Sequence, residues 1–371
     1  MTSLPRLALP FQANNALDPT SMTAMQNTDH TASKQSSSRI SALGCIVRCL
    51  ALAASMLASL GAQAAEAPQP LYLRNSNPLL QTLGAPAMQG GELTPAGSLE
   101  YRWVLNMANH ADRGLSDHEE AVFDGESYFL ALVLRYGLGP RLELGVELPL
   151  VAHTSGAFDT LIKDWHELLG LSNDERLLPD NSLRLFYRRN GVTEYDIDES
   201  GAGLGDIRLA AAYRLAGSDG RALALRAQAE LPSGDAERLH GNGAVDLSLV
   251  LDATDRDSFA ASRVSLFGLL GVVAPGAGDL LKDQRRDWVP LIGAGLAWQS
   301  TERVDLHAQL AYDGAYFDSQ LDELESSTRL TFGASYRFGQ HGPKLSIALT
   351  ENLFSDSTPD FGLYFSLTNR R

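Results

Sequence analysis

The sequence predicts an all-β protein: a transmembrane up-and-down antiparallel β-barrel of about 12 strands, with one short helix in the third long loop. Three observations predict it. Apolar side chains recur at every second residue from residue 98 to near the end of the chain, the number of such segments is even, and short and long connections alternate between them. An alternating strand turns successive side chains to opposite faces, so each segment has two faces of different character.

The alternation is clearest in residues 207–231. Ile207 and Leu209 point one way while Arg208 and Ala210 point the other, and the pattern repeats after the turn at Gly220. Two such arms joined by a tight turn predict a hairpin. Extended to the rest of the chain, the same rhythm predicts strands at 99–105, 128–136, 142–150, 207–215, 223–231, 245–251, 264–272, 292–298, 304–312, 330–338, 345–349 and 361–367.

The connections between these segments support a barrel over a soluble sandwich. The short ones read "GLGP", "AGSDG", "ATDRDS", "STER" and "GQHGP", and the intervening ones are all longer, the longest running from about residue 152 to residue 203. In an up-and-down barrel this alternation gathers the short turns at one rim and the long loops at the other, as in bacterial outer-membrane barrels. A sandwich has no reason to separate them.

The two faces of the predicted strands decide which side meets lipid. One face is almost purely Leu, Val, Ile, Ala, Phe and Tyr, whereas the other carries charges. A charge on a lipid face costs roughly 2–4 kcal/mol at mid-bilayer, while a polar lumen tolerates it. In a soluble sandwich the apolar face would instead be the core. We therefore predict an apolar exterior and a charged interior, with these candidate lumen-lining residues: Arg102, Glu143, Glu147, Asp206, Arg208, Arg226, Glu230 and His307.

The N-terminal part of the chain predicts export. Residues 1–64 are expected to be a signal peptide with a long polar leader, cleaved after Ala62-Gln63-Ala64. The length of the leader leaves open a true start further in, for example at Met25. Both cysteines, Cys45 and Cys49, lie within it. Residues 65–97, rich in Pro and Gly, are expected to be an extended lead-in or a partial plug, and residues 98–371 the barrel. The predicted location is the outer membrane of a Gram-negative cell.

Composition narrows the partners. The formal net charge is −15 and there is no basic patch interleaved with aromatics, which argues against nucleic acid. We expect outer-membrane lipids, the outer-membrane assembly machinery and small solutes as partners, and no cofactor. The sequence leaves the oligomeric state open.

One stretch of the longest connection has helical rather than strand spacing. In "SGAFDTLIKDWHELLGL" the apolar residues fall three or four apart, which predicts an amphipathic helix. We treat Phe158, Trp165 and His166 as a candidate constriction helix. It could fold into the lumen, pack on the rim or rest in the outer leaflet.

No catalytic motif stands out. The glycines of "GAGLGD" precede a strand rather than a helix, unlike a phosphate-binding loop, and "LPSGDAERLHGNGAVD" lacks the residue order of a calcium loop. Of the histidines after the signal peptide, we expect only His307 within a strand, as a lumen residue. The protein is therefore not expected to be an enzyme. A lipid-modifying outer-membrane enzyme is the least favoured alternative.

Several phrases resemble an uncharacterised proteobacterial outer-membrane β-barrel family known only as a domain of unknown function (DUF3187-like). They are "RNSNPLL", "ELPLVAHTSGAFDTLIKDWHELLGL", "YRRNG", "GLGDIRLAAAYRL" and "ELPSGD", spread over the chain after the signal. "GLGD" and "LPSGD" are also similar to segments of outer-membrane channels linked to uptake of aromatic compounds. The resemblance implies fold and location but no substrate. The chain departs from the usual aromatic last residue by ending "YFSLTNRR", so either the assembly signal is internal or the last predicted strand is offset.

Two functions follow from these observations. In the first, the protein is an integral outer-membrane channel or binding protein for small solutes, and inward charges set its selectivity. In the second, it is a closed structural or interaction barrel whose lumen charges pair with one another and whose loops form the working surface.

Overall fold

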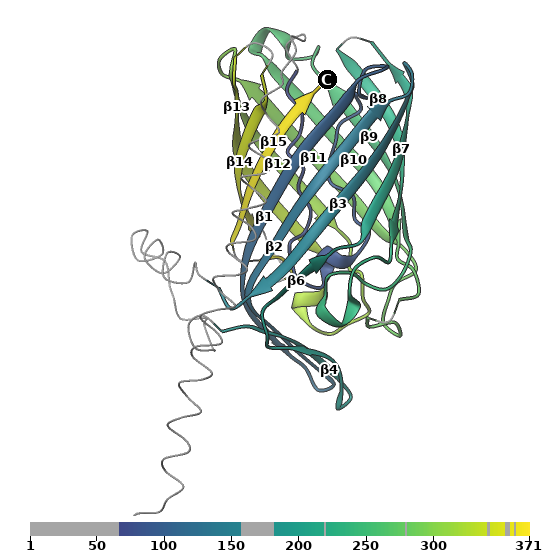
Figure 1. Cartoon of the computed structure of the whole chain (residues 1–371), viewed down its shortest axis with the longest axis vertical. Coiled ribbons are helices and arrows are strands. Elements are labelled where there is room, and N and C mark those ends of the chain that lie inside the picture. The colour runs from purple at the N-terminus through teal and green to yellow at the C-terminus, as the bar shows by residue number, and fades with distance from the viewer. Residues whose placement is uncertain are drawn as a thin grey trace, which may run out of the picture. The chain divides into compact units, whose positions relative to one another are not determined.

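Antiparallel strands close into a single barrel because the first strand pairs with the last (Figure 1). β1 (Leu99–Leu115) pairs with β15 (Phe361–Arg370) from Glu100↔Arg370 to Asn109↔Phe361. The computed structural model describes residues 67–156, 182–218, 220–278, 280–339, 342–352, 357–359 and 361–371. Within these residues no helix is both long and apolar enough to cross a membrane. The predicted all-β, 12-strand antiparallel barrel is confirmed.

The remaining barrel strands pair with their neighbours in chain order. They are β2 (Glu119–Gly137), β3 (Leu142–Thr154), β7 (Ile207–Gly217), β8 (Arg221–Leu231), β9 (Asp246–Asp255), β10 (Val264–Ala274), β11 (Val289–Gln299), β12 (Val304–Asp313), β13 (Ser327–Arg337) and β14 (Lys344–Asn352). Each contains most of the segment that alternation predicts. β15 reaches Arg370, so the last predicted strand is placed correctly and ends on a polar residue rather than an aromatic one.

The barrel wall is apolar outside and polar inside. Leu249 in β9 is 45% exposed, whereas Arg226 in the neighbouring β8 is 2% exposed. The same contrast holds around the ring, with these large apolar side chains exposed: Leu144, Leu148, Leu209, Tyr213, Leu247, Leu270, Ile292, Leu296, Trp298, Leu306, Leu310, Phe332, Ile347 and Leu349. A soluble sandwich would bury these leucines between two sheets, and the structure excludes that alternative.

The two rims differ as the connections predict, with one correction. The short-turn rim carries the connections 138–141, 256–263 and 300–303, and it also holds the start of β1 and the end of β15, where Leu99 and Arg371 exchange backbone hydrogen bonds. The opposite end is the long-loop rim. The expected long loop between the first two strands is wrong, because β1 and β2 continue as a paired hairpin to a turn at 116–118.

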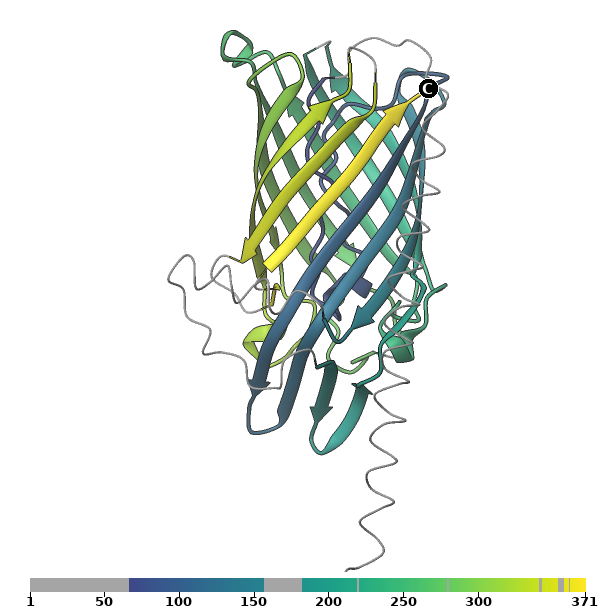
Figure 2. The ribbon, with the colours of Figure 1, turned by 60° about the vertical axis from the view of Figure 1, so that its left-hand side comes forward.

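That hairpin belongs to an extension of the wall beyond the long-loop rim (Figure 2). Where β3 ends, β4 (Arg184–Arg189) takes its place beside β2, and β5 (Val192–Ile197) pairs with β4. β6 (Gly201–Leu204) pairs with the end of β3. One face of the extension carries Phe123, Leu185 and Tyr187, which are buried in an apolar cluster with loop residues such as Leu280 and Phe317. The extension therefore packs against the loops of the long-loop rim.

Four short 3-10 helices complete the described elements. They are η2 (Leu80–Thr82), η3 (Ala236–Arg238), η4 (Ala260–Ser262) and η5 (Asp322–Leu324). η2 lies before the first strand, inside the barrel, and its residues are all buried. The predicted helix in the third long loop, with Phe158, Trp165 and His166, lies outside the described residues.

Candidate functional site

The chain before β1 occupies the barrel interior. We call residues 67–94 the lumen segment; most of its side chains are buried, and it runs as an irregular trace inside the ring of strands (Figure 1). Near the short-turn rim, Gln69 contacts Glu100 and Arg102 of β1. Further along, Asn75 donates a hydrogen bond to the carbonyl of Ser357 in the β14–β15 connection. This first pass therefore leads from the short-turn rim toward the long-loop rim.

The segment then turns and comes back. At η2 the Asn77 side chain accepts hydrogen bonds from the backbone N–H groups of Leu79 and Leu80, which fixes the turn. On the return pass the Gly84 N–H donates to Asp246 at the start of β9, and the Gly91 N–H donates to Thr254 near the end of β9. Two antiparallel passes of irregular chain thus lie within the barrel.

The return pass approaches the wall too closely for any side chain at Gly91. A Cβ at that position would overlap the backbone carbonyl oxygen of Ala222 and press on that of Asp252. Beyond it, the Thr94 N–H donates to Glu143 of β3 at 2.7 Å. Glycine at position 91 lets the segment's backbone lie directly against the strands.

All eight candidate lumen-lining residues lie in the interior. None of these residues is more than 5% exposed, and they come from β1, β3, β8 and β12 and from the start of β7: Arg102, Glu143, Glu147, Asp206, Arg208, Arg226, Glu230 and His307. The structure divides them between two ion-pair networks, one carboxylate that binds a loop, and one histidine.

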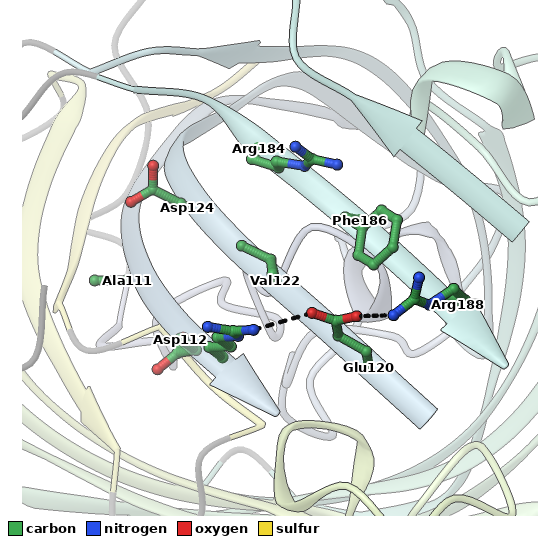
Figure 3. Close-up of a pocket in the computed structure, with 9 residues that line it drawn as sticks. Ala111, Asp112, Glu120, Val122, Asp124, Arg184, Phe186 and Arg188 are labelled. Carbon is green, nitrogen blue, oxygen red and sulfur yellow. Dashed lines mark hydrogen bonds and ion pairs between the residues drawn. The ribbon is translucent and has the colours of Figure 1, made fainter. Parts of the chain in front are cut away.

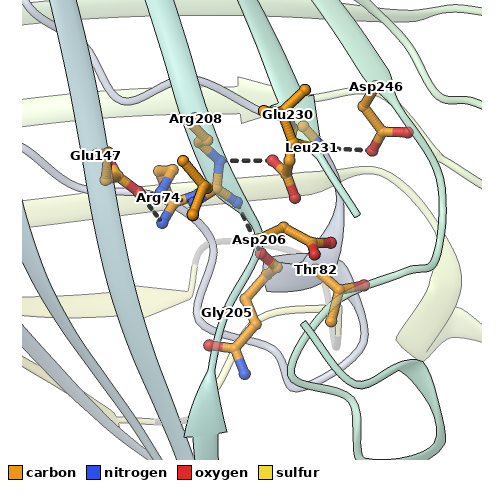
Figure 4. A network of polar contacts seen from close by, with 12 residues as sticks. Arg74, Thr82, Glu147, Gly205, Asp206, Arg208, Glu230, Leu231 and Asp246 are labelled. Carbon is orange, nitrogen blue, oxygen red and sulfur yellow. Dashed lines mark hydrogen bonds and ion pairs between the residues drawn. The ribbon is translucent and has the colours of Figure 1, made fainter. Parts of the chain in front are cut away.

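The first network joins the lumen segment to the wall (Figure 4). Arg208 of β7 lies 2.7 Å from Glu147 of β3 and 2.5 Å from Glu230 of β8, so it bridges three strands. Glu147 also pairs with Arg74 of the lumen segment at 3.0 Å and accepts a hydrogen bond from the Tyr72 hydroxyl at 2.5 Å. A buried charge needs such partners, because an unpaired one costs several kcal/mol.

The second network lies nearer the short-turn rim. Arg226 of β8 pairs with Glu143 at 2.8 Å and with Asp252 of β9 at 3.0 Å. Glu100 of β1 pairs with Arg135 of β2, and with Arg102 at 3.4 Å. Most of these pairs join one wall strand to another, so the wall's charges are largely balanced without the lumen segment.

The remaining predicted residues have different surroundings. Asp206 accepts backbone hydrogen bonds from Ser233, Gly234 and Asn242, and therefore holds the β8–β9 loop. His307 contacts the Ser335 hydroxyl at 2.8 Å. In the described part of the chain, no group of three or more His, Cys, Asp or Glu side chains is arranged to hold a metal ion.

The histidine prediction needs a correction. His110 lies in β1 and His153 in β3, because both strands extend further than the alternation indicates. The Ser127 hydroxyl of β2 lies between them, 3.2 Å from His110 Nε2 and 2.9 Å from His153 Nδ1. All three side chains are buried. These hydrogen bonds join β1, β2 and β3 inside the barrel.

Sequence reasoning missed two kinds of interior residue. Glu100 and Asp252 share the inward parity of their strands, so the alternation that indicated Arg102 could have found them. Tyr72 and Arg74 lie in a stretch without any period, and no signal in the sequence placed them beside Glu147.

Two small cavities lie beside the lumen segment in the described part of the chain. One cavity lined by Arg74, Met88, Gln309 and Arg329 has a volume of about 30 Å³. Another, lined by Arg74, Asn106 and Leu363, has a volume of about 20 Å³. On this measure about 10–15 Å³ holds one water molecule, so each of these two cavities has room for about one or two waters.

The sequence of the chain matches the model of one protein family over residues 46–370, described as "Protein of unknown function (DUF3187)". The chain belongs to this family. The match covers the lumen segment and nearly all of the barrel. No curated protein matches the chain.

Several solved barrels are similar to this DUF3187 member at low identity. The COG4313 outer membrane channel from Pseudomonas putida F1 is 13% identical, covering 76% of this chain and 98% of its own, with a TM-score of 0.47. A KdgM porin is 8% identical over 73% of this chain and 98% of its own, with a TM-score of 0.37. The Ralstonia pickettii toluene transporter TbuX is 11% identical over 75% of this chain and 90% of its own, with a TM-score of 0.36. All three are distant in shape as well as in sequence.

Proposed function

We propose that this protein is an integral outer-membrane β-barrel whose passage is closed by its own lumen segment. The apolar exterior is suited to lipid, and the short-turn rim, with the start of β1 and the end of β15, would face the periplasm. Export by a cleaved signal peptide, contact with outer-membrane lipids and insertion by the assembly machinery are parts of the same proposal.

One observation carries the closed state. The lumen segment is bound on opposite sides of the ring, through Tyr72 and Arg74 to Glu147 in β3 and through the Leu71 carbonyl to Gln309 in β12. Its two passes fill the section that a solute would have to cross. The working surface of a closed barrel is its loops and the extension at the long-loop rim.

Planar-bilayer recording tests the closed state directly. The mature chain should give no steady current, while a variant lacking residues 67–94 should give a steady one, because the emptied ring leaves an aqueous path. Circular dichroism in micelles must show that both chains keep their β content. A large steady current from the full mature chain would overturn the proposal.

A small-solute channel is the second candidate, favoured by the wall's own charge balance. If the lumen segment moves away, Glu147 keeps Arg208 and Glu143 keeps Arg226, so the strands retain paired charges around an open lumen. Those inward charges would then set ion selectivity. A reversal potential measured on the variant without residues 67–94, and its shift on Glu147→Gln, tests that role. The binding of solutes at the closed mouth is a related form of the same candidate.

A further inference from the structure

The long-loop rim has polar clusters on both faces of the wall, and they differ in how they are held. On the outer face of the extension, a pocket of about 390 Å³ is lined by side chains that pair with one another (Figure 3). Glu120 there pairs with both Arg113 and Arg188. Inside the same rim lie three buried histidines that are held by hydrogen bonds and ring stacking: His110, His153 and His240. A proton taken up by such an imidazole changes the contacts around it.

The hydrogen bonds of His153 show which of its nitrogens carries the hydrogen. Nε2 lies 3.3 Å from the Leu239 carbonyl oxygen, and a carbonyl only accepts, so Nε2 is the donor. Nδ1 therefore accepts from the Ser127 hydroxyl, 2.9 Å away. The same hydroxyl accepts from His110 Nε2 at 3.2 Å, and within the described residues His110 Nδ1 has no hydrogen-bond partner. Both rings are thus neutral, and a further proton would leave a buried N–H or O–H group without an acceptor.

The loop between β8 and β9 is bound to the turn of the lumen segment. We call residues 232–245 the latch loop. Asn242 of this loop donates from Nδ2 to the Thr82 carbonyl in η2, 2.9 Å away. Leu239 of the loop is fully buried and belongs to the same apolar cluster as Leu79. The latch loop therefore holds the lumen segment at the point where the segment turns back.

The contact of the latch loop with His153 keeps a strained residue in place. Leu239 has φ 52° and ψ 31°, in the left-handed region that is unfavourable for a residue with a Cβ atom. Its carbonyl accepts from His153, and the His240 ring stacks on the His153 ring with centroids 5.9 Å apart and planes 17° apart. Strain of this kind persists only where the surroundings maintain it. Loss of the His153 contacts would therefore favour release of the loop.

Burial has the largest effect on His240 and lowers the pKa of its imidazole. In the described part of the chain, Asp235 raises this pKa and Arg238 lowers it, while β6 approaches the ring with Gly203, which has no side chain. Asp206 of the wall holds the loop through backbone N–H groups. A lowered pKa in the closed loop favours closure above the ordinary histidine pKa of about 6.5, and this preference is lost as the pH falls below it.

We propose that the β8–β9 loop is an acid-released latch on the turn of the lumen segment. Below about pH 6.5, His153 and His240 gain protons more readily when the loop is open, because an open loop lets their rings reach water. Opening breaks the hydrogen bond between Asn242 and Thr82 and frees the turn. The long-loop rim is the outer one in the proposed placement, so the latch would respond to acid outside the cell. The inference rests on the closed lumen proposed above.

Hydrogen exchange of the full mature chain in micelles tests the latch, with rates corrected for the intrinsic effect of pH. From pH 7.5 to pH 5.0, the protection of residues 232–245 and 79–83 should fall together. The expected fall is about 30-fold for each histidine that must be neutral in the closed loop. The double variant His153→Gln/His240→Gln keeps an amide donor for the Leu239 carbonyl but gains no proton, so its protection should change by less than about threefold.

Several variants separate the latch from a general loosening of the rim. His118→Gln is the matched control, because His118 is an exposed histidine in the β1–β2 turn, and this variant should respond to acid as the wild type does. His240→Gln alone leaves the hydrogen bonds between β1, β2 and β3 in place and should show a smaller fall than the wild type. Asn242→Ala should lower the protection of residues 79–83 already at pH 7.5.

Three outcomes would overturn the inference. They are protection of the latch loop that does not depend on pH in the wild type, an equal fall in the double variant, and unchanged protection of residues 79–83 in Asn242→Ala. Bilayer current at pH 7.5 reports on the proposed function separately. A steady current from the wild type would refute the closed lumen, whereas the exchange of residues 232–245 would still show whether acid releases the loop.

Discussion

The Arg74 guanidinium of the lumen segment lies 3.0 Å from a Glu147 carboxylate oxygen of β3. Glu147 also pairs with Arg208 at 2.7 Å and accepts a hydrogen bond from Tyr72. A single wall carboxylate therefore binds two residues of the lumen segment and one of the next barrel strand. The position of the segment and the stability of the wall depend on the same side chain.

Glu147→Gln should weaken both the fold and the closure. The change leaves Arg74 and Arg208 buried with less negative charge, and breaking a buried pair costs roughly 3–5 kcal/mol. We expect a lower free energy of unfolding in micelles, measured by urea denaturation, together with intermittent current in bilayers. Arg74→Gln should lower the free energy of unfolding by less, because Glu147 stays paired with Arg208 in that variant. Equal unfolding free energies for E147Q and the wild type would contradict this role.

Gly91→Ala should displace the return pass of the lumen segment. The added Cβ would overlap the Ala222 carbonyl oxygen, and a strand backbone in a closed ring has little room to move. We expect a leak current that the wild type lacks, with the β content unchanged. Gly139→Ala is the matched control, because a Cβ there meets nothing within 4 Å. A Gly91→Ala variant that gives no leak current would show that the lumen segment adjusts without opening a path through the barrel.

Leu249→Arg tests the lipid-facing surface. Leu249 lies mid-way along β9 and is 45% exposed, and an arginine at mid-bilayer costs roughly 2–4 kcal/mol. Val245, beside the start of the same strand at the long-loop rim, faces outward as well, and Val245→Arg should cost only about 0–1 kcal/mol. The measurement is the free energy of unfolding in lipid vesicles for both variants. If both variants lost the same small amount of unfolding free energy, this face of the barrel would not be in contact with a bilayer.

Acid should loosen the extension at the long-loop rim through Glu119. Burial alone would raise the pKa of its carboxyl, but hydrogen bonds from the Gln320 N–H and the Ser319 and Tyr187 hydroxyls outweigh burial and lower the pKa below its usual value. A lowered pKa in the folded state gives stability that is present above the carboxyl's ordinary pKa of about 4.3 and is lost as the pH falls through the folded-state pKa.

The comparison of wild type with Glu119→Gln measures this contribution. Hydrogen exchange of residues 314–326 should be slower in the wild type than in the variant at pH 7. The difference should shrink below about pH 4, as the wild-type carboxyl gains a proton. If the difference in exchange rate between the two proteins stayed constant from pH 7 to pH 3, the stabilisation would come from the packing of the Glu119 side chain rather than from its charge.

Alternation of side chains was enough to predict the strands and their faces. The period of two residues is a local property, so Leu249 could be placed outside and Arg226 inside without knowing any partner. The lengths of β1 and β2 were underestimated, because beyond residue 108 the outward positions become polar and the apolar rhythm is lost. Strand pairing, rather than pattern, extends the hairpin to residue 115.

The contacts inside the barrel depend on information that no local pattern holds. Glu143 pairs with Arg226 although they are 83 residues apart, and only the registers of β3, β7 and β8 bring them together. The lumen segment is held by its backbone N–H groups at Gly84 and Gly91, which every residue except proline has. For that reason its composition indicated an irregular stretch but not where each residue would lie.

The β1–β15 seam constrains how the molecule can be assembled. The ring's two edges belong to the earliest and latest strands of the chain, and their pairing ends with Leu99 and Arg371 exchanging hydrogen bonds. Until the final strand has been synthesised, both edges carry unpaired backbone groups that could recruit other chains. The ring can therefore close only after β15 has been made, and a chain without β15 would form an open sheet with two unpaired edges instead of a smaller barrel.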